Sequence, residues 1–163
     1  MRAVAFLRNL NHGQGGAPGG GDLVAAFVAA GASGVRTVRG NGTVVLDAAD
    51  PQRCTDDAVA ALHAASVWTD IGVALAADVL AAALRSAPDD DGRWELSAFA
   101  AEAHVEVPLA GRRCTVTAAG PGWALTRNER DRESNATPTL ERVLRRPVTS
   151  RAVATVRLAL AAG

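Results

Sequence analysis

Lysine is absent from this chain of 163 residues, and all 17 of its basic residues are arginine. Without lysine the chain has neither the phosphate-binding loop that depends on that residue nor a route through a lysine Schiff base. Tyrosine is absent too, and the aromatic side chains come only from three tryptophans and three phenylalanines. We therefore expect a core that is lean in aromatic residues.

Cysteines and long apolar runs are also scarce. The two cysteines, Cys54 and Cys114, lie far apart and outside any CxxC pattern, so we expect free thiols and a cytoplasmic protein. No run of 18 uncharged apolar residues is present, which argues against a membrane span. The apolar run at residues 3–7 is too short for a secretory signal.

The short motifs that mark metal and cofactor sites are missing as well. His104 and Glu106 have the spacing of the zinc deaminases but lack the cysteine pair, and the aspartates at 89–91 lack the spacing of a calcium loop. Pro18 stands where the third glycine of a dinucleotide fingerprint would be. We expect neither a metal nor a cofactor, and no motif for a catalytic nucleophile is recognisable.

The charges balance overall but are distributed unevenly. Residues 1–110 carry seven arginines against thirteen acids, and residues 111–163 carry ten arginines against four acids. An arginine-rich half is typical of polyanion binding, so a nucleic-acid-binding module is one alternative. Two oppositely charged halves that dock on each other explain the pattern as well, and the interleaved acids favour a solvated helix face.

The first half of the chain alternates strand and helix signals in the order β-α-β-β-α-β. Asp22 predicts a helix start, and Gly31 predicts its end. Residues 40–42 predict a hairpin turn, and Asp50 followed by Pro51 predicts a second helix. The expected strands are 3–8, 35–39, 43–47 and 71–75, and the expected helices are 23–30 and 51–65. This order predicts an antiparallel ferredoxin-like sheet with two helices on one face.

The second half is less regular and predicts a smaller α+β subdomain, residues 88–163, packed on the ferredoxin-like subdomain, residues 1–87. An acidic turn at 88–92 marks the boundary, although one continuous domain is an alternative. Residues 128–135 read as a charged, mobile connection, and Thr137 followed by Pro138 predicts a helix start. The expected helices are 78–86, 138–145 and 150–161, and the expected strands are 94–100, 104–107, 113–118 and 122–126.

The glycine-rich loop after the first strand is the best candidate for a binding site. Its glycines allow backbone N–H groups to approach a ligand, and Arg8 at the end of the strand suits a phosphate or a carboxylate. Arg36 and Arg39 flank the second strand and can form a basic rim with Arg8, although a solvated strand face is the alternative. We therefore expect a small anionic or nucleotide-like ligand. The candidate ligand-binding residues are Arg8, Asn9, Asn11, His12, Gln14, Arg39 and Asn41.

Two other interpretations of this loop remain open. It can be an ordinary strand-to-helix turn whose polar residues cap the sheet. An enzyme would need a general acid or base, and His12 beside Arg8 and Asn11 is the only local grouping that supplies one. The nucleic-acid alternative lacks the aromatic strand residues on which open ferredoxin-like sheets stack bases.

Several segments resemble an uncharacterised bacterial family known as domain of unknown function 1697. The opening FLRNLN with its glycine loop, the hairpin NGTVVLD and the closing LERVLRRPVTSRAVATVRLAL carry this resemblance. Asn9 and His12 replace a glycine and a valine of the family's opening pattern. The resemblance implies a two-part α+β fold with a ferredoxin-like unit and no established activity. The matching positions are Leu7, Arg8, Leu10, Asn11, Gly13, Gly42, Val44, Val45 and Arg151.

Overall fold

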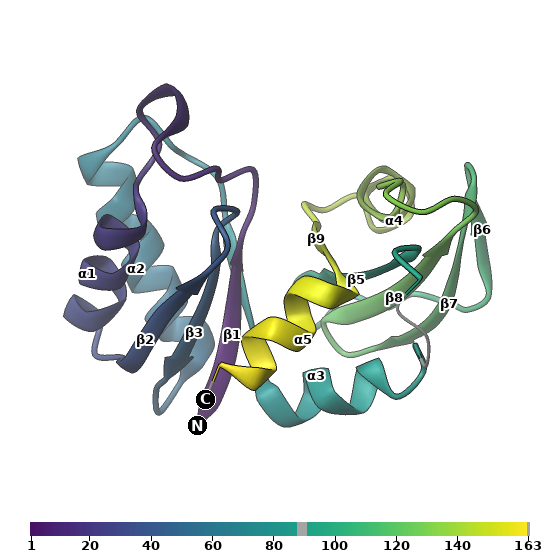
Figure 1. Cartoon of the computed structure of the whole chain (residues 1–163), viewed down its shortest axis with the longest axis horizontal. Helices are drawn as coiled ribbons and strands as arrows, with labels where there is room; N and C mark the ends of the chain where they lie inside the picture. Colours follow the sequence, from purple (N-terminus) through teal and green to yellow (C-terminus); the bar gives the residue numbers. More distant parts are fainter. Residues whose placement is uncertain (88–90, 163) are drawn as a thin grey trace. The chain divides into compact units, whose positions relative to one another are not determined.

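A computed structural model of the chain describes residues 1–87 and 91–162 (Figure 1). They form two compact units, one made of Met1–Ala77 with the end of the chain from Leu158 onward, the other of Asp78–Arg157. The division between the units therefore falls at residue 77, ahead of the acidic turn expected as the boundary. Residues 88–90 of that turn lie outside the described residues.

The first unit has the expected ferredoxin-like arrangement. Its four strands lie in the order β2-β3-β1-β4, and every neighbouring pair is antiparallel. The two long helices cover one face of this sheet (Figure 1). The predicted βαββαβ order is confirmed. The elements are β1 (Arg2–Leu7), η1 (Gln14–Gly16), α1 (Gly20–Ala29), β2 (Ser33–Val38), β3 (Thr43–Asp47), α2 (Pro51–Ala65) and β4 (Gly72–Ala76).

Local capping signals explain where the two helices of this unit begin. Asp50 caps α2 as predicted, because its carboxylate accepts the Arg53 N–H at 3.0 Å and Pro51 occupies the first helical position. Helix α1 begins three residues earlier than predicted. Gly19 is its N-cap, and Asp22 lies within the first turn, where its Oδ2 accepts the Gly19 N–H at 2.8 Å.

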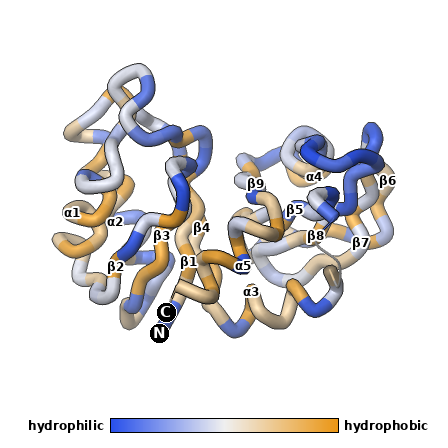
Figure 2. The backbone as a smooth tube through the Cα atoms, in the orientation of Figure 1, coloured by the Kyte–Doolittle hydropathy of each residue, from blue (hydrophilic) through white to orange (hydrophobic). Residues whose placement is uncertain are grey.

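The core of the first unit lies between the sheet and its helices. Leu7 and Leu46 from the strands pack with Leu23 and Phe27 of α1 and with Leu62 of α2. Figure 2 shows the hydrophobic colouring along β1, β4 and α1 that accompanies this packing. Burial of these apolar side chains, each worth about 1.5–3 kcal/mol, supplies the main stabilising contribution of the unit.

The second unit is built on a five-stranded antiparallel sheet in the order β6-β7-β8-β5-β9. Its core includes Phe99, Val116 and Ala124, with Leu140 of α4 packed against them. This unit makes the fold α+β, as predicted. Its elements are α3 (Ala77–Leu84), β5 (Trp94–Ala98), β6 (Leu109–Gly111), β7 (Cys114–Gly120), β8 (Trp123–Asn128), α4 (Ala136–Leu144) and β9 (Thr149–Ala152), together with the first part of α5 (Val153–Ala161), whose residues from Leu158 onward belong to the first unit.

Three expectations for this half were wrong. Residues 104–107 form no strand, whereas the short strand β6 lies just after them at Leu109–Gly111. The segment 150–161 is not helical throughout, because residues 149–152 pair with β5 as β9 before α5 begins. Residues 128–135 are not a free connection, since the side chain of Asn128 is buried and hydrogen bonded to both Glu95 and the backbone of Glu133.

Candidate functional site

Arg8 follows β1 directly, and the structure pairs its side chain with an acid of the same chain. The Arg8 N–H donates to the Ile71 carbonyl at 2.8 Å, which places the preceding residue, Asp70, beside the arginine. Arg8 Nη1 lies 2.8 Å from Asp70 Oδ2, and the two side chains are only 24% and 21% exposed. The guanidinium is thus already neutralised, which contradicts the hypothesis that it is presented to an incoming anion.

The other polar residues of the loop mainly stabilise the turn itself. Asn9 Nδ2 donates to the same Asp70 oxygen at 2.9 Å. The Gln14 N–H donates to the Asn11 carbonyl at 3.2 Å, and both side chains are exposed beside η1. These contacts agree with the alternative of an ordinary strand-to-helix turn.

His12 joins the loop to the β2–β3 hairpin. Its N–H donates to the Gly40 carbonyl at 2.9 Å, and its ring lies beside Gly20. The Nε2 atom is buried without a hydrogen-bond partner among the described residues, and burial lowers the pKa of His12. An imidazole in this setting favours the neutral form, and the described residues offer it no hydrogen-bonded partner for proton exchange.

The two hairpin residues predicted for the site, Arg39 and Asn41, lie at the turn between β2 and β3. Arg39 is exposed and has a left-handed backbone, with φ of 58°. Asn41 Oδ1 accepts the Thr43 hydroxyl at 2.9 Å, which stabilises the hairpin turn. The sequence thus identified a structured junction of loop and hairpin.

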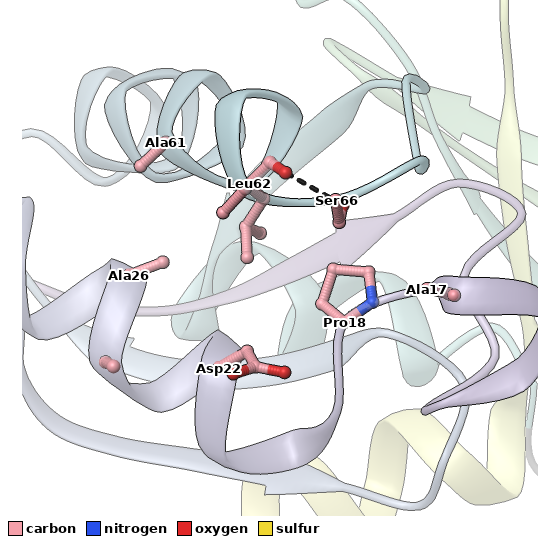
Figure 3. A pocket seen from close by; sticks show the side chains of 10 residues that line it. Ala17, Pro18, Asp22, Ala26, Ala61, Leu62 and Ser66 are labelled. Atoms are coloured by element: carbon pink, nitrogen blue, oxygen red, sulfur yellow. Dashed lines mark hydrogen bonds between the residues drawn. The ribbon is translucent and has the colours of Figure 1, made fainter.

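A cavity of about 360 Å³ lies beside the loop, between α1 and the end of α2 (Figure 3). Its polar side chains are already engaged, since Ser66 Oγ donates to the Leu62 carbonyl at 2.8 Å and Asp22 accepts the Gly19 N–H. The negative charge of Asp22 also disfavours an anion. None of the seven predicted site residues lines it; the lining residues are Gly16, Ala17, Pro18, Asp22, Ala25, Ala26, Ala61, Leu62, Ala65 and Ser66.

A second cavity, of about 310 Å³, lies in the second unit and has the opposite character. Arg112, in the turn between β6 and β7, contributes one guanidinium, and Arg142 on α4 contributes another. Asn135, Pro138 and Thr139 complete the lining. We call this the two-arginine cavity. Neither of its guanidinium groups forms an ion pair or hydrogen bond with any residue in the described ranges 1–87 and 91–162.

Close packing holds the β6–β7 turn against α4 at this cavity. A Cβ atom placed on Gly111 would lie 2.4 Å from Thr139 Oγ1 and 2.8 Å from Cys114 Sγ, so only glycine permits this approach. The neighbouring Arg112 is thereby brought beside the helix face that carries Arg142. Two positive charges on one cavity, with no internal carboxylate to neutralise them, favour an anion with two negative charges.

A buried carboxylate fixes the start of α4 and hence the floor of this cavity. Glu95 on β5 is only 5% exposed, and its Oε2 accepts the N–H groups of Asn135 and Ala136 at 3.2 and 3.1 Å. Its Oε1 accepts the Ser134 hydroxyl at 2.7 Å. The segment that leads into α4 is strongly hydrophilic (Figure 2). Glu95 thus satisfies helical N–H groups that no local side chain caps.

Several arginines of the C-terminal half are neutralised within the unit. Arg127 Nη2 lies 3.0 Å from Asp91 and its guanidinium stacks 5.6 Å from the Trp94 ring, so that face of the tryptophan is covered. These contacts remove charges and one aromatic face from the surface that a nucleic acid would use. The other ion pairs are Arg113 with Glu133 at 3.1 Å, Arg93 with Asp91 at 3.7 Å, and Arg146 with Glu102.

The residues of the two-arginine cavity were only partly visible in the sequence. The spacing of Asn135, Thr139 and Arg142 at three and four residues predicts a shared helix face once the helix is recognised. Arg112 belongs to a turn some 25 residues earlier, and no local pattern connects it with that face. Asp70, the partner of Arg8, gave no signal either.

Together the fold and its cavities define a two-sheet α+β protein with a ferredoxin-like unit. Within the described residues, no three His, Cys, Asp or Glu side chains are grouped closely enough to hold a metal ion. No helix in that part of the chain is long and apolar enough to cross a membrane.

Comparison with known proteins identifies the family. Residues 1–108 match the family described as protein of unknown function DUF1697. The chain therefore belongs to this family, as the opening loop and hairpin predicted. A solved structure of a conserved bacterial protein from Streptococcus pneumoniae has a similar fold, with a TM-score of 0.65 and 13% identity over 99% of this chain and 97% of that one. None of the curated proteins matches the chain.

Proposed function

We propose that this protein binds a small dianion, such as a phosphate ester, in the two-arginine cavity. The observation that carries the proposal is the presence of Arg112 and Arg142 on one cavity without a carboxylate partner among the described residues. Arginine forms paired, charge-assisted hydrogen bonds with phosphate oxygens, and two arginines match the charge of a phosphomonoester. The class of ligand expected from the sequence is kept, but its site moves from the loop to the second unit.

The size of the cavity supports a small molecule over a polymer. A volume of about 310 Å³ is at the lower end of the range of ligand pockets and exceeds the need of a bare phosphate. The neighbouring arginines Arg113 and Arg127 are paired with acids, and these ion pairs interrupt the positive charge around the cavity. A cytoplasmic setting is part of this proposal and agrees with the free thiols of Cys54 and Cys114.

The test is the binding of inorganic phosphate and of a phosphomonoester at low ionic strength, followed by calorimetry or by amide chemical shifts. Each charge-assisted contact is worth about 1.5–3 kcal/mol, so Arg112→Ala and Arg142→Ala should each weaken binding by roughly tenfold or more. Amide shifts should be confined to the β6–β7 turn and to α4 with the residue before it, Asn135.

The matched control is Arg130→Ala, which removes the same charge from an exposed arginine of the same unit that lies outside the cavity. Its phosphate affinity should stay close to that of the unaltered protein. Equal losses of phosphate affinity in all three variants would mean that only the net charge of the protein matters, and would contradict a specific site. Loss of binding in Arg8→Ala, with Arg112→Ala unchanged, would refute the proposal and return the site to the loop after β1.

A further inference from the structure

The orientation of the Asn135 side chain follows from a chain of hydrogen bonds that starts at Glu95. A carboxylate can only accept, so the group of Asn128 that lies 2.8 Å from Glu95 Oε2 must be the Nδ2 donor. The same Nδ2 also donates to the backbone carbonyls of Glu133 at 3.0 Å and Arg93 at 3.3 Å. The carbonyl oxygen of the Asn128 amide is therefore turned toward Asn135.

The orientation of the Asn128 amide determines the orientation of the Asn135 amide. Asn128 Oδ1 is an acceptor, so Asn135 must present Nδ2 to it, and the distance is 3.1 Å. Asn135 Nδ2 also lies 3.3 Å from Glu133 Oε2, which is again an acceptor. Both donor positions of this amide are thus used, and no residue in the described part of the chain bonds to its Oδ1. A buried carboxylate has fixed the polarity of a residue that lines the two-arginine cavity.

The cavity therefore combines two cationic donors with an oriented neutral acceptor. The dianion of a simple alkyl phosphate, like a carboxylate, carries no O–H donor, so a ligand of either kind offers no hydrogen bond to Asn135 Oδ1. A ligand that carries a hydroxyl group near its anionic group would satisfy both kinds of side chain.

We propose that the ligand is a hydroxyl-bearing phosphomonoester, held at its phosphate by Arg112 and Arg142 and at a hydroxyl by Asn135 Oδ1. This inference rests on the proposed function and adds the class of ligand that the site selects. Asn135 is thereby a residue that determines specificity, whereas the arginines supply affinity. Its side chain makes no capping hydrogen bond to α4, so its removal leaves the Glu95 cap of the helix in place.

The experiment compares three probes: inorganic phosphate, glycerol 3-phosphate, and propyl phosphate, which has the same carbon chain without hydroxyl groups. The unaltered protein should bind glycerol 3-phosphate about tenfold more tightly than propyl phosphate, as expected for one satisfied hydrogen bond in a partly enclosed site. Asn135→Ala should abolish this preference and leave the affinity for propyl phosphate unchanged. Arg112→Ala should weaken all three probes together.

The outcomes separate the two proposals. Binding of phosphate that depends on Arg112, with equal affinities for the two esters in the unaltered protein, would overturn the inference about Asn135 and leave the proposed function standing. The same holds if the preference survives in Asn135→Ala. Absence of binding by every probe would overturn both. The comparison of the two esters in the unaltered protein needs no variant. It therefore tests the preference for a hydroxyl group even if Asn135→Ala fails to fold.

Discussion

Replacing Glu95 by alanine is expected to destabilise the second unit, because this buried carboxylate organises the start of α4. Glu95 accepts four hydrogen bonds, from the side chains of Asn128 and Ser134 and from the backbone N–H groups of Asn135 and Ala136. Asn128 retains backbone acceptors without it, and Ser134 is exposed to water. The main effect of the substitution is therefore that the backbone N–H groups of Asn135 and Ala136 lose their acceptor.

The size of the effect follows from the burial of those groups. Ala136 is fully buried, and leaving its N–H without an acceptor costs about 1–3 kcal/mol. Loss of a negative charge at the N-terminus of a helix adds about 0.5–2 kcal/mol where the site is partly buried. We expect Glu95→Ala to lower the free energy of unfolding by about 2–4 kcal/mol in total.

Glu95→Gln should be milder, because its amide oxygen can still accept from Ala136 and its NH₂ can face Ser134; we expect a loss of about 1 kcal/mol. The assay is urea unfolding followed by circular dichroism, together with hydrogen exchange at the Ala136 amide, whose protection should fall most. Glu106→Ala, which removes an exposed acid of the same unit, should leave the midpoint unchanged. A Glu95→Ala protein with unaltered stability and exchange would refute this account of how α4 begins.

Two further predictions concern the first unit. Burial lowers the pKa of His12, so the unfolded chain binds a proton at a higher pH than the folded one, and stability should decline as the pH falls below about 6.5. His12→Gln should flatten this decline, measured as urea midpoints between neutral and acid pH. His104→Gln, which changes an exposed residue, should leave the decline as it is. Gly72→Ala should cost about 1–3 kcal/mol, because its Cβ would lie 2.7 Å from both Leu7 Cδ2 and Thr55 Cγ2. In the same denaturation assay Gly21→Ala, in open space on α1, should stabilise by about 0.5 kcal/mol, and the opposite order of the two glycine variants would contradict the packing described.

The candidate site shows why local patterns in the sequence could not distinguish a binding site from a structured turn. The loop after β1 contains an arginine, several amides and many glycines, and these residues are typical both of anion sites and of structured turns. The choice between the two depended on Asp70, which lies 62 residues from Arg8 along the chain and beside it in the fold. No local pattern contains that information.

The sequence by itself determined the elements whose signals are local. Asp50 with Pro51 caps α2, the Asn41–Gly42 step turns the β2–β3 hairpin, and the order of elements specifies the ferredoxin-like sheet, because each depends on residues a few positions apart. Family membership could be inferred from the same segments.

Tertiary structure alone decided the features that depend on distant partners. Residues 149–152 have a helical neighbour in α5, yet they form β9 because β5 offers them backbone hydrogen bonds. Helix α4 begins at Ala136 because the carboxylate of Glu95 reaches it from another strand. Arg112 and Arg142 share a cavity because Gly111 lets the β6–β7 turn approach α4. Long-range hydrogen bonds, charges and close packing depend on the folded geometry, so local propensity cannot reveal them.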